Sequence, residues 1–339
     1  MRIRKDLLLA AFLFVVILVT GISIFFSPAL DTGGGEVKII VRKGETISQL
    51  ASDLSKDKMI GSETLFRIAC FITGADSRLK AGRYTLQHEM SYAALASLFA
   101  SDNYEKAVVF DLYNGIPVKA VFNKLLMMKL TDSSEIRSLF SDSLFFASAG
   151  LKFPSDLEGA VLPGSYIIYP GENLRDIIRK GIDSMNNFMA VNYKNAKMPV
   201  NLTPYQVVIL ASIVQGETNL KREMPAVAGV YLNRLKKGIK LEADPTVQYA
   251  LPGGKKKRLY FSDLLTDSPY NTYRYSGLPP GPINNPGRDA ILSVLNPDSH
   301  NYLFFCASPT GGHKFAETYE DHLKNAKEYQ AWLDSKNIK

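Results

Sequence analysis

The chain has 339 residues, of which 46% are hydrophobic and 22% are charged, and its formal net charge is +7. This composition excludes a disordered chain, and the length exceeds the usual size of one core, so we expect a main domain with smaller satellites. The positive charge favours anionic partners, but no nucleic-acid-binding motif is present, and we expect no nucleic-acid partner.

The first segment is basic and then apolar. Arg2, Arg4 and Lys5 precede residues 7–26, which carry no charge. A helix rises about 1.5 Å per residue, so this run would cross the roughly 30 Å of a bilayer's hydrocarbon core. We predict a cytoplasmic segment at 1–6 and one transmembrane helix at 7–26, with the remaining chain outside the cytoplasm. A cleaved signal peptide is the alternative, although no A-x-A cleavage pattern follows.

A Gly-rich linker at 27–36 precedes a small module at 37–106. Its first run, VKIIVRKGETISQLASDL, predicts a strand, a turn at Gly44 and a helix capped by Thr46 or Ser48. A second helical run and the strand-like LKAGRYTL follow. This strand–helix–helix–strand order and the segment RKGETISQLA resemble LysM modules, which bind N-acetylglucosamine-containing glycans of cell walls. The alternative is a spacer that has this shape without the binding.

The two cysteines and four histidines give little sign of special chemistry. Cys70 and Cys306 lie in apolar runs, which predicts buried free thiols. A disulfide between them is permitted outside the cytoplasm but does not follow from the sequence. The histidines show no metal-ligand spacing, so we expect neither a metal nor another cofactor.

Residues 107–200 predict ordinary elements, including a strand and helix around Gly115 and a strand at 165–169. The following segment, NLTPYQVVILASIVQGET, starts a helix with Thr203 as N-cap, Pro204 at the first position and Gln206 completing a capping box. Apolar residues then recur at helical spacing as far as Glu217, which places this carboxylate within the apolar stripe.

A carboxyl group in an apolar stripe is a candidate general acid. Burial disfavours the ionised form and raises the pKa, which keeps a proton available for donation near neutral pH. This is the environment of the acid residue in glycoside cleavage. The structural alternative is that Glu217 is solvated at a frayed helix end, or is paired with Arg234.

Three segments after this helix carry further polar residues. The run MPAVAGVYLNRLKKG predicts a helix with Asn233 and Arg234, and LEADPTVQYAL predicts a turn in which Asp244 caps a helix ahead of Thr246. The loop SPYNTYRYSGLPPGPINNPG is stiffened by proline and presents aromatic rings and amide groups, which suit the faces and hydroxyl edges of sugars. A packed structural loop is the alternative. Its four candidate side chains are Tyr270, Asn271, Thr272 and Tyr273.

Taken in order, ASIVQGETN, EMPAVAGVYLNRLKKGIKLEADPTVQYAL, SPYNTYRYSGLPPGPINNPG and GGHKF resemble the endolytic murein transglycosylases of the MltG (YceG-like) family. The resemblance covers the whole chain and implies that Glu217 is the catalytic residue. Many members have a second glutamate where this chain has Gln215. The residues that the resemblance places along the cleft are Thr218, Asn233, Arg234, Asp244, Thr246, Tyr270, Asn271, Thr272 and Tyr273.

The resemblance also implies a reaction. A membrane-anchored lytic transglycosylase would cut the β-1,4 bond between N-acetylmuramic acid and N-acetylglucosamine in nascent glycan strands. Glu217 would protonate the glycosidic oxygen and then accept the proton of the muramic acid 6-hydroxyl, which closes on C1 and leaves a 1,6-anhydro end. The implied partners are glycan strands, the membrane and peptidoglycan synthases. The implied location is the plasma (inner) membrane, with a single pass, a cytoplasmic N-terminus and a periplasmic catalytic domain.

We therefore expect an α+β chain with a single N-terminal transmembrane helix, a LysM-like βααβ subdomain at 37–106 and a mixed α+β catalytic domain at 107–339. Its active-site half would be 200–339. One alternative is a hydrolytic muramidase with Asp244 or Glu242 as a second carboxylate. Another is a non-catalytic wall-binding scaffold that uses the LysM-like module and the basic run GGKKKR at 253–258.

Overall fold

The computed structural model describes residues 2–252, 256 and 259–336, with the backbone alone at 2–6, 9, 17–18 and 24. These residues form an α+β chain with two compact units, one of Met1–Val108 and Ile167–Pro170, the other of Val109–Tyr166 and Gly171–Lys339. The basic run at 253–258 lies outside the described residues except for Lys256, which pairs with Asp263 at 2.6 Å.

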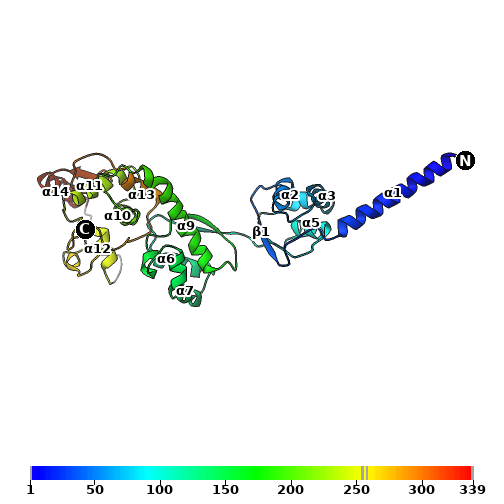
Figure 1. Cartoon of the computed structure of the whole chain (residues 1–339). Coiled ribbons are helices and arrows are strands. Elements are labelled where there is room, and N and C mark those ends of the chain that lie inside the picture. The colour runs from blue at the N-terminus through cyan, green and yellow to red at the C-terminus, as the bar shows by residue number, and fades with distance from the viewer. Residues whose placement is uncertain (1, 253–255, 257–258, 337–339) are drawn as a thin grey trace. The chain divides into compact units, whose positions relative to one another are not determined.

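The first unit is a two-stranded antiparallel sheet with helices packed beside it (Figure 1). Val37 lies opposite Leu86, and Val41 lies opposite Gly82. Of the two caps predicted for α2 (Ile47–Lys56), Thr46 is the one observed: its side chain accepts a hydrogen bond from the Gln49 N–H, and Gln49 completes a capping box that was not predicted. The elements are α1 (Arg2–Phe26), β1 (Val37–Val41), α2 (Ile47–Lys56), α3 (Glu63–Thr73), α4 (Ala75–Arg78), β2 (Gly82–Leu86) and α5 (Tyr92–Ala100).

The predicted transmembrane helix at 7–26 is contradicted. α1 is helical over this range, but no helix in the described part of the chain is long and apolar enough to cross a membrane. The prediction rested on the length of an uncharged run and on the basic residues before it, and these features are not sufficient for a membrane span. At the end of α1, Phe25 packs against the core of the first unit.

The second unit contains most of the helices together with short strand pairs. β5 and β6 form an antiparallel pair in which Phe304 lies opposite Ala316 and Ala307 lies opposite His313. β3 and β4 form another two-stranded sheet, of which residues 109–112 and 164–166 belong to the second unit. The elements from β3 onward are β3 (Val108–Leu112), α6 (Val118–Met127), α7 (Ser133–Phe140), α8 (Ser143–Ser148), η1 (Pro154–Leu157), β4 (Gly164–Ile168), α9 (Leu174–Asn192), η2 (Tyr193–Asn195), α10 (Pro204–Glu217), α11 (Met224–Lys236), α12 (Asp244–Ala250), η3 (Asp263–Leu265), α13 (Arg288–Leu295), β5 (Phe304–Ala307), β6 (His313–Ala316) and α14 (Tyr319–Ser335).

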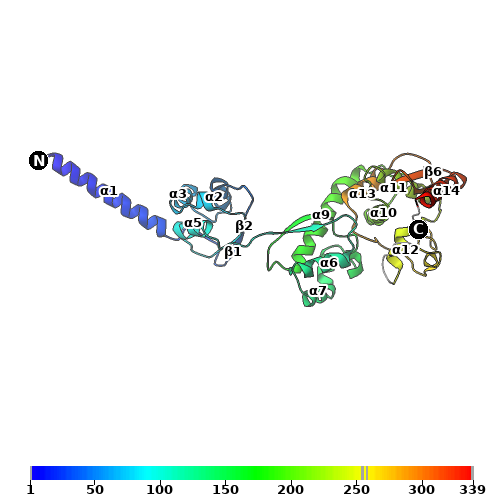
Figure 2. The same ribbon diagram turned by 180° about the vertical axis from the view of Figure 1, so that it is seen from behind.

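α10 is the central helix of this unit. α11, α12 and α13 pack against it, and Figures 1 and 2 show α10 next to α11 and α13 from opposite sides. The predicted helix start is confirmed, because Thr203 caps α10 and exchanges capping-box hydrogen bonds with Gln206. The predicted single apolar stripe is wrong, because every residue from Val207 to Gln215 is buried. A helix surrounded by other helices is apolar on all sides, so it has no solvent face to set against a stripe.

The cysteines are free thiols, as predicted. Cys70 is buried in α3, and this burial raises the pKa of its thiol to about 12. Cys306 in β5 is only half-buried, so the prediction of burial holds for Cys70 alone.

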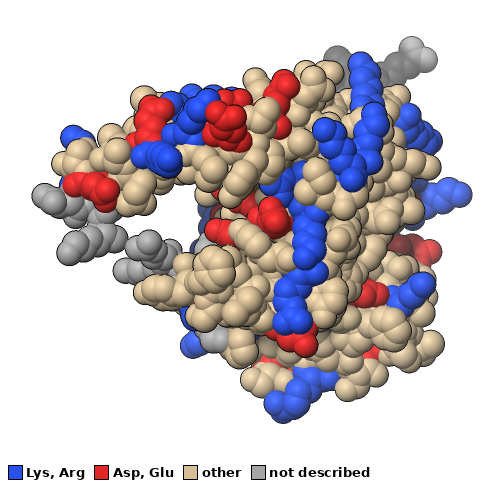
Figure 3. Space-filling view, turned by 90° about the vertical axis from the view of Figure 1, so that its left-hand side faces the viewer, with Lys and Arg blue, Asp and Glu red and all other residues tan. Residues whose placement is uncertain are grey.

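Charges of both signs are mixed on the surface. On the face shown in Figure 3, Lys and Arg side chains lie beside Asp and Glu side chains, with uncharged areas between them. Several Lys and Arg side chains lie one below another down this face, with Asp and Glu side chains beside them.

Candidate active site

Glu217 is the last residue of α10, at the point where the helix leaves the core. Thr218 follows in extended backbone, with φ −147° and ψ 145°. The Thr218 hydroxyl is turned into the protein, where its oxygen accepts a hydrogen bond from the Leu220 N–H at 3.0 Å. Thr218 thus shapes the end of the helix. The Glu217 side chain at this end lines two cavities.

Two cavities meet at this carboxyl. The first, which we name the polar cavity, has a volume of about 350 Å³ and is bounded by α11, β5, β6 and α14. The second, the wide cavity, has a volume of about 730 Å³ and is bounded by residues 113–119, Glu158 and α12. Glu217 and Asp244 belong to the walls of both. Both volumes suit an organic ligand, and a chain-like ligand that occupied both would pass the carboxyl.

The surroundings of Glu217 keep its proton on near neutral pH. Burial of the carboxyl raises its pKa from 4.5 to about 7. The Tyr231 hydroxyl donates a hydrogen bond to Oε1 at 2.5 Å and opposes this rise, while the charge of Asp244 adds to it. Desolvation is the largest cause of this rise, while the side chain as a whole is half-buried and borders both cavities.

Asp244 does not cap its helix, which was the structural role predicted for it. It is the first residue of α12, whose N-cap is Ala243, and its side chain caps nothing. Its Oδ1 accepts a hydrogen bond from the Tyr273 hydroxyl at 2.6 Å. Because Tyr273 comes from the Pro-stiffened loop and also lines the polar cavity, this contact fixes the loop beside the carboxyl pair.

Arg234 is held by the framework and does not pair with Glu217. Its guanidinium donates to the Leu303 carbonyl at 2.6 Å, to the Lys240 carbonyl at 2.9 Å and to the Glu242 carboxylate at 2.9 Å. Asn233 donates to two backbone carbonyls in the segment before β5. These contacts tie α11 to the β5–β6 pair, and they leave Arg234 as a wall of the polar cavity.

Four other predicted cleft residues lie in the protein framework. Thr246 and Thr272 are buried, their hydroxyl oxygens are 2.9 Å apart, and the Ala243 N–H donates to Thr272. Asn271 is fully buried and holds its loop through the carbonyls of residues 264 and 266. The Tyr270 ring packs against the Tyr249 ring, with centroids 4.9 Å apart and planes inclined at 49°. The structure thus brings Asp244, Arg234 and Tyr273 to the cavities with Glu217. Substrate contact by any of the predicted residues stays a prediction.

Sequence reasoning missed several residues at the site. Tyr231 lay on the apolar face predicted for its helix. A buried tyrosine hydroxyl usually has a hydrogen-bond partner, so this residue could have indicated a polar group nearby. His313 and His322 line the polar cavity from β6 and α14, far away in the chain. Gln215, which the sequence analysis had named, is buried and accepts a hydrogen bond from the Gly287 N–H at 3.1 Å. Its position is therefore structural.

No metal-binding cluster is found among the residues that the structure describes. Within this part of the chain, no three His, Cys, Asp or Glu side chains are grouped so that they could hold an ion. The chemistry that this site can perform with its own residues is proton transfer by Glu217, assisted by the hydrogen bond from Tyr231.

Comparisons with known proteins give consistent results. A model of the YceG-like family matches residues 39–328. The chain is 32% identical over 317 residues to an endolytic murein transglycosylase of Bacillus subtilis (strain 168), covering 89% of this chain and 86% of the relative. It is 26% identical over 326 residues to one of Streptococcus pneumoniae (strain R6), covering 86% of this chain and 58% of that relative. The crystal structure of a yceG-like protein from Listeria monocytogenes has a TM-score of 0.55 and 27% identity, and the match covers 86% of this chain and 98% of that one.

Proposed function

The chain belongs to the YceG-like family, and from this premise we propose that it is an endolytic murein transglycosylase, an enzyme of the cell envelope that cuts peptidoglycan glycan strands. One observation carries the proposal. The Glu217 carboxyl, with a pKa raised to about 7, stands where two cavities meet. An endolytic enzyme must hold sugars on both sides of the bond that it cuts, and cavities on both sides of the acid supply that room.

Glu217 serves first as the acid and then as the base. In the first step it donates its proton to the oxygen between N-acetylmuramic acid and N-acetylglucosamine, and the bond to C1 breaks. In the second it accepts the proton of the muramic acid 6-hydroxyl as that oxygen bonds to C1. The product carries a 1,6-anhydro end and the carboxyl is protonated again. Acid–base assistance of this kind typically contributes about 10²–10⁴-fold.

The internal hydroxyl competes with water for C1. A well-oriented intramolecular group reaches effective molarities of about 10⁵–10⁸ M, far above that of water. The environment of Glu217 supports this route, because the burial that raises its pKa also limits the water beside it. One carboxyl is then sufficient for both steps.

The mass of the products tests the reaction. Glycan strands digested in ¹⁸O-labelled water should give muramic acid ends without label, one water lighter than the products of hydrolysis. Quantitative label at C1 would contradict the transglycosylase and would identify a muramidase.

The muramidase is the second candidate, and the structure favours one residue for it. Asp244 shares the walls of both cavities with Glu217, whereas the Glu242 carboxylate is held by Arg234. Asp244 would therefore be the second carboxylate of a hydrolytic mechanism. An Asp244→Asn enzyme that still makes anhydro ends would exclude this role.

The module at 37–106 is proposed as a glycan-binding part of the same enzyme. A cavity of about 420 Å³ lies at the turn between β1 and α2, with Arg42, Glu45, Gln49 and Asp53 in its wall. Hydrogen-bonding side chains at such a turn suit sugar hydroxyls. A Gln49→Ala chain that sediments with insoluble murein as completely as the wild type would contradict glycan binding at this cavity. A non-catalytic scaffold is excluded by any turnover of the strands.

A further inference from the structure

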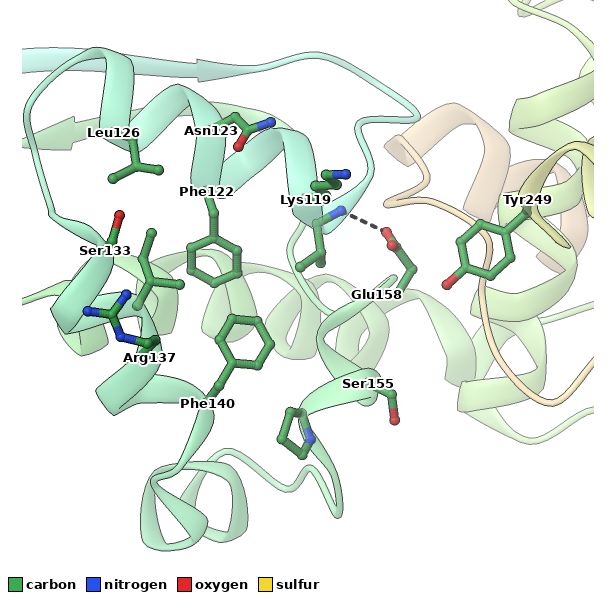
Figure 4. A pocket seen from close by; sticks show the side chains of 13 residues that line it. Lys119, Phe122, Asn123, Leu126, Ser133, Arg137, Phe140, Ser155, Glu158 and Tyr249 are labelled. Atoms are coloured by element: carbon green, nitrogen blue, oxygen red, sulfur yellow. Dashed lines mark hydrogen bonds between the residues drawn. The ribbon is translucent and has the colours of Figure 1, made fainter. Parts of the chain in front are cut away.

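A third cavity of the second unit continues the site described above. This apolar cavity, of about 560 Å³, lies between α6, α7 and the residues that follow α8, and Figure 4 shows its lining. Three of its residues, Lys119, Glu158 and Tyr249, also line the wide cavity. The apolar, wide and polar cavities therefore adjoin in series, and Glu217 stands between the second and the third.

The floor of the apolar cavity is aromatic and aliphatic. Phe122 of α6 and Phe140 of α7 face each other there, with ring centroids 5.3 Å apart and ring planes inclined at 55° (Figure 4). Phe140 is 38% exposed, so its ring is accessible to a ligand. Leu126 and Ile136 complete the apolar surface. Since the rings are strongly inclined, they make no flat platform for a sugar ring, and they suit small aliphatic groups better.

The rim of this cavity carries cations. Lys119 and Arg137 are exposed, and within the described part of the chain neither makes an ion pair, while Arg137 lies near enough to Asp132 to interact with its charge. The one carboxyl of the lining, Glu158, is already used: its Oε1 accepts a hydrogen bond from the Val118 N–H at 3.0 Å, the dashed line in Figure 4. The cavity thus offers an apolar floor and two exposed cations to its occupant.

We propose that the apolar cavity binds the stem peptide of the glycan strand, the short acidic peptide that N-acetylmuramic acid carries on its lactyl group. This inference rests on the proposed function. Small side chains such as alanine methyls fit the Phe122–Phe140 floor, and peptide carboxylates fit the rim cations. Because the cavity adjoins the wide cavity, a peptide could enter it while the strand that bears it passes Glu217. Peptide recognition would then distinguish nascent strands from strands whose peptides have been removed.

Cleavage of two matched substrates tests this proposal. Glycan strands with stem peptides, and the same strands after amidase removal of the peptides, are digested by the wild type and by Arg137→Glu. The wild type should show a kcat/KM about fivefold to tenfold higher on peptide-bearing strands, as one charge-assisted contact would give. Arg137→Glu should lose this preference and keep its rate on stripped strands. Lys194→Glu is the control, because it makes the same charge change at an exposed residue outside the three cavities.

A binding measurement separates this proposal from the proposed function. A fluorescent tripeptide with two carboxylates is titrated into Glu217→Gln protein, with and without Arg137→Glu. Saturable binding that only Arg137→Glu abolishes supports the site even if no strand is cut, in which case the function alone fails. Equal kcat/KM of the wild type on both substrates, or binding that Lys194→Glu weakens as much as Arg137→Glu, would overturn the stem-peptide site while the function stands.

Discussion

At the scale of single residues, the free-energy cost of ionising Glu217 decides what the site can do. The helix end places a carboxyl where water is scarce, and the native state keeps its proton up to about pH 7, whereas the value for an exposed glutamate is 4.5. Above that pH the protein holds a poorly solvated negative charge, so this residue costs stability there. The raised pKa of Glu217 and the lower stability of the protein above about pH 7 are thus two results of the same burial.

Replacing Glu217 with glutamine should abolish cleavage and stabilise the fold at alkaline pH. Native Glu217 binds more protons than unfolded Glu217 between pH 4.5 and about 7, so wild-type stability falls as the pH rises through that window. Glu217→Gln removes the charge, and urea unfolding at pH 8 should show a gain of about 1–3 kcal/mol, less than the full shift implies because solvent reaches part of the side chain. The gain should vanish near pH 4. A mutant with more than a few per cent of wild-type turnover would move the catalytic role elsewhere.

The pH profile should report Glu217 and respond to Tyr231. The kcat/KM for glycan strands should fall about tenfold per pH unit above about 7, because the free enzyme must be protonated at Glu217. Tyr231→Phe removes the hydrogen bond that favours the carboxylate, so the alkaline limb should move upward by about one unit. Tyr273→Phe is the comparison, since its hydroxyl bonds Asp244 instead. If the alkaline limb of the kcat/KM profile does not move in Tyr231→Phe, a group other than Glu217 controls that limb.

At the scale of elements, the site depends on how closely α10 approaches α12. These helices carry Glu217 at the end of one and Asp244 at the start of the other. Gly216 allows the approach, because a Cβ there would lie 2.6 Å from the Pro245 Cβ. Real contacts of this kind are longer, and neither partner is the far end of a flexible side chain, so the helices would have to separate.

Gly216→Ala should therefore damage activity more than its loss of stability explains. We expect kcat/KM to fall at least about tenfold, with an overpacking cost of about 1–3 kcal/mol in urea unfolding. Thr203→Ala is the matched control on the same helix. It removes the capping box at the opposite end of α10, should cost about 1 kcal/mol, and should leave kcat/KM nearly unchanged. Equal activity losses in the two variants would show that the α10–α12 spacing is not critical.

At the scale of the whole molecule, no disulfide bond links the described parts of the chain. Both cysteines are free, and each unit has its own buried core or cluster of apolar residues. A reducing agent should therefore leave the thermal unfolding midpoint of the full chain unchanged. Brief alkylation of the native protein should label half-buried Cys306 and spare Cys70, whose thiol is buried and has a pKa of about 12. A midpoint that falls on reduction would reveal a disulfide.

The sequence by itself determined local features, which depend on residues close together in the chain. The capping box at Thr203 follows from residues three positions apart, and the cap at Thr46, one of two candidates, is equally local. The likeness to a known family followed from ordered motifs and led to Glu217. An uncharged run alone, however, did not establish a membrane span at 7–26, since no helix of the described chain meets the length and apolarity required.

Only the tertiary structure decided which polar residues meet. Glu217, Tyr231 and Asp244 come from three helices, so the hydrogen bond from Tyr231 and the influence of the Asp244 charge depend on packing that no local spacing encodes. The same packing surrounded α10 on all sides, removed the predicted stripe and placed Thr246 and Asn271 in the framework. Local hydrogen bonds are specified within a few residues, whereas burial is set by every element that covers a side chain. The chemistry of this site depends on burial, because a glutamate with water around it would titrate near 4.5 and not near 7.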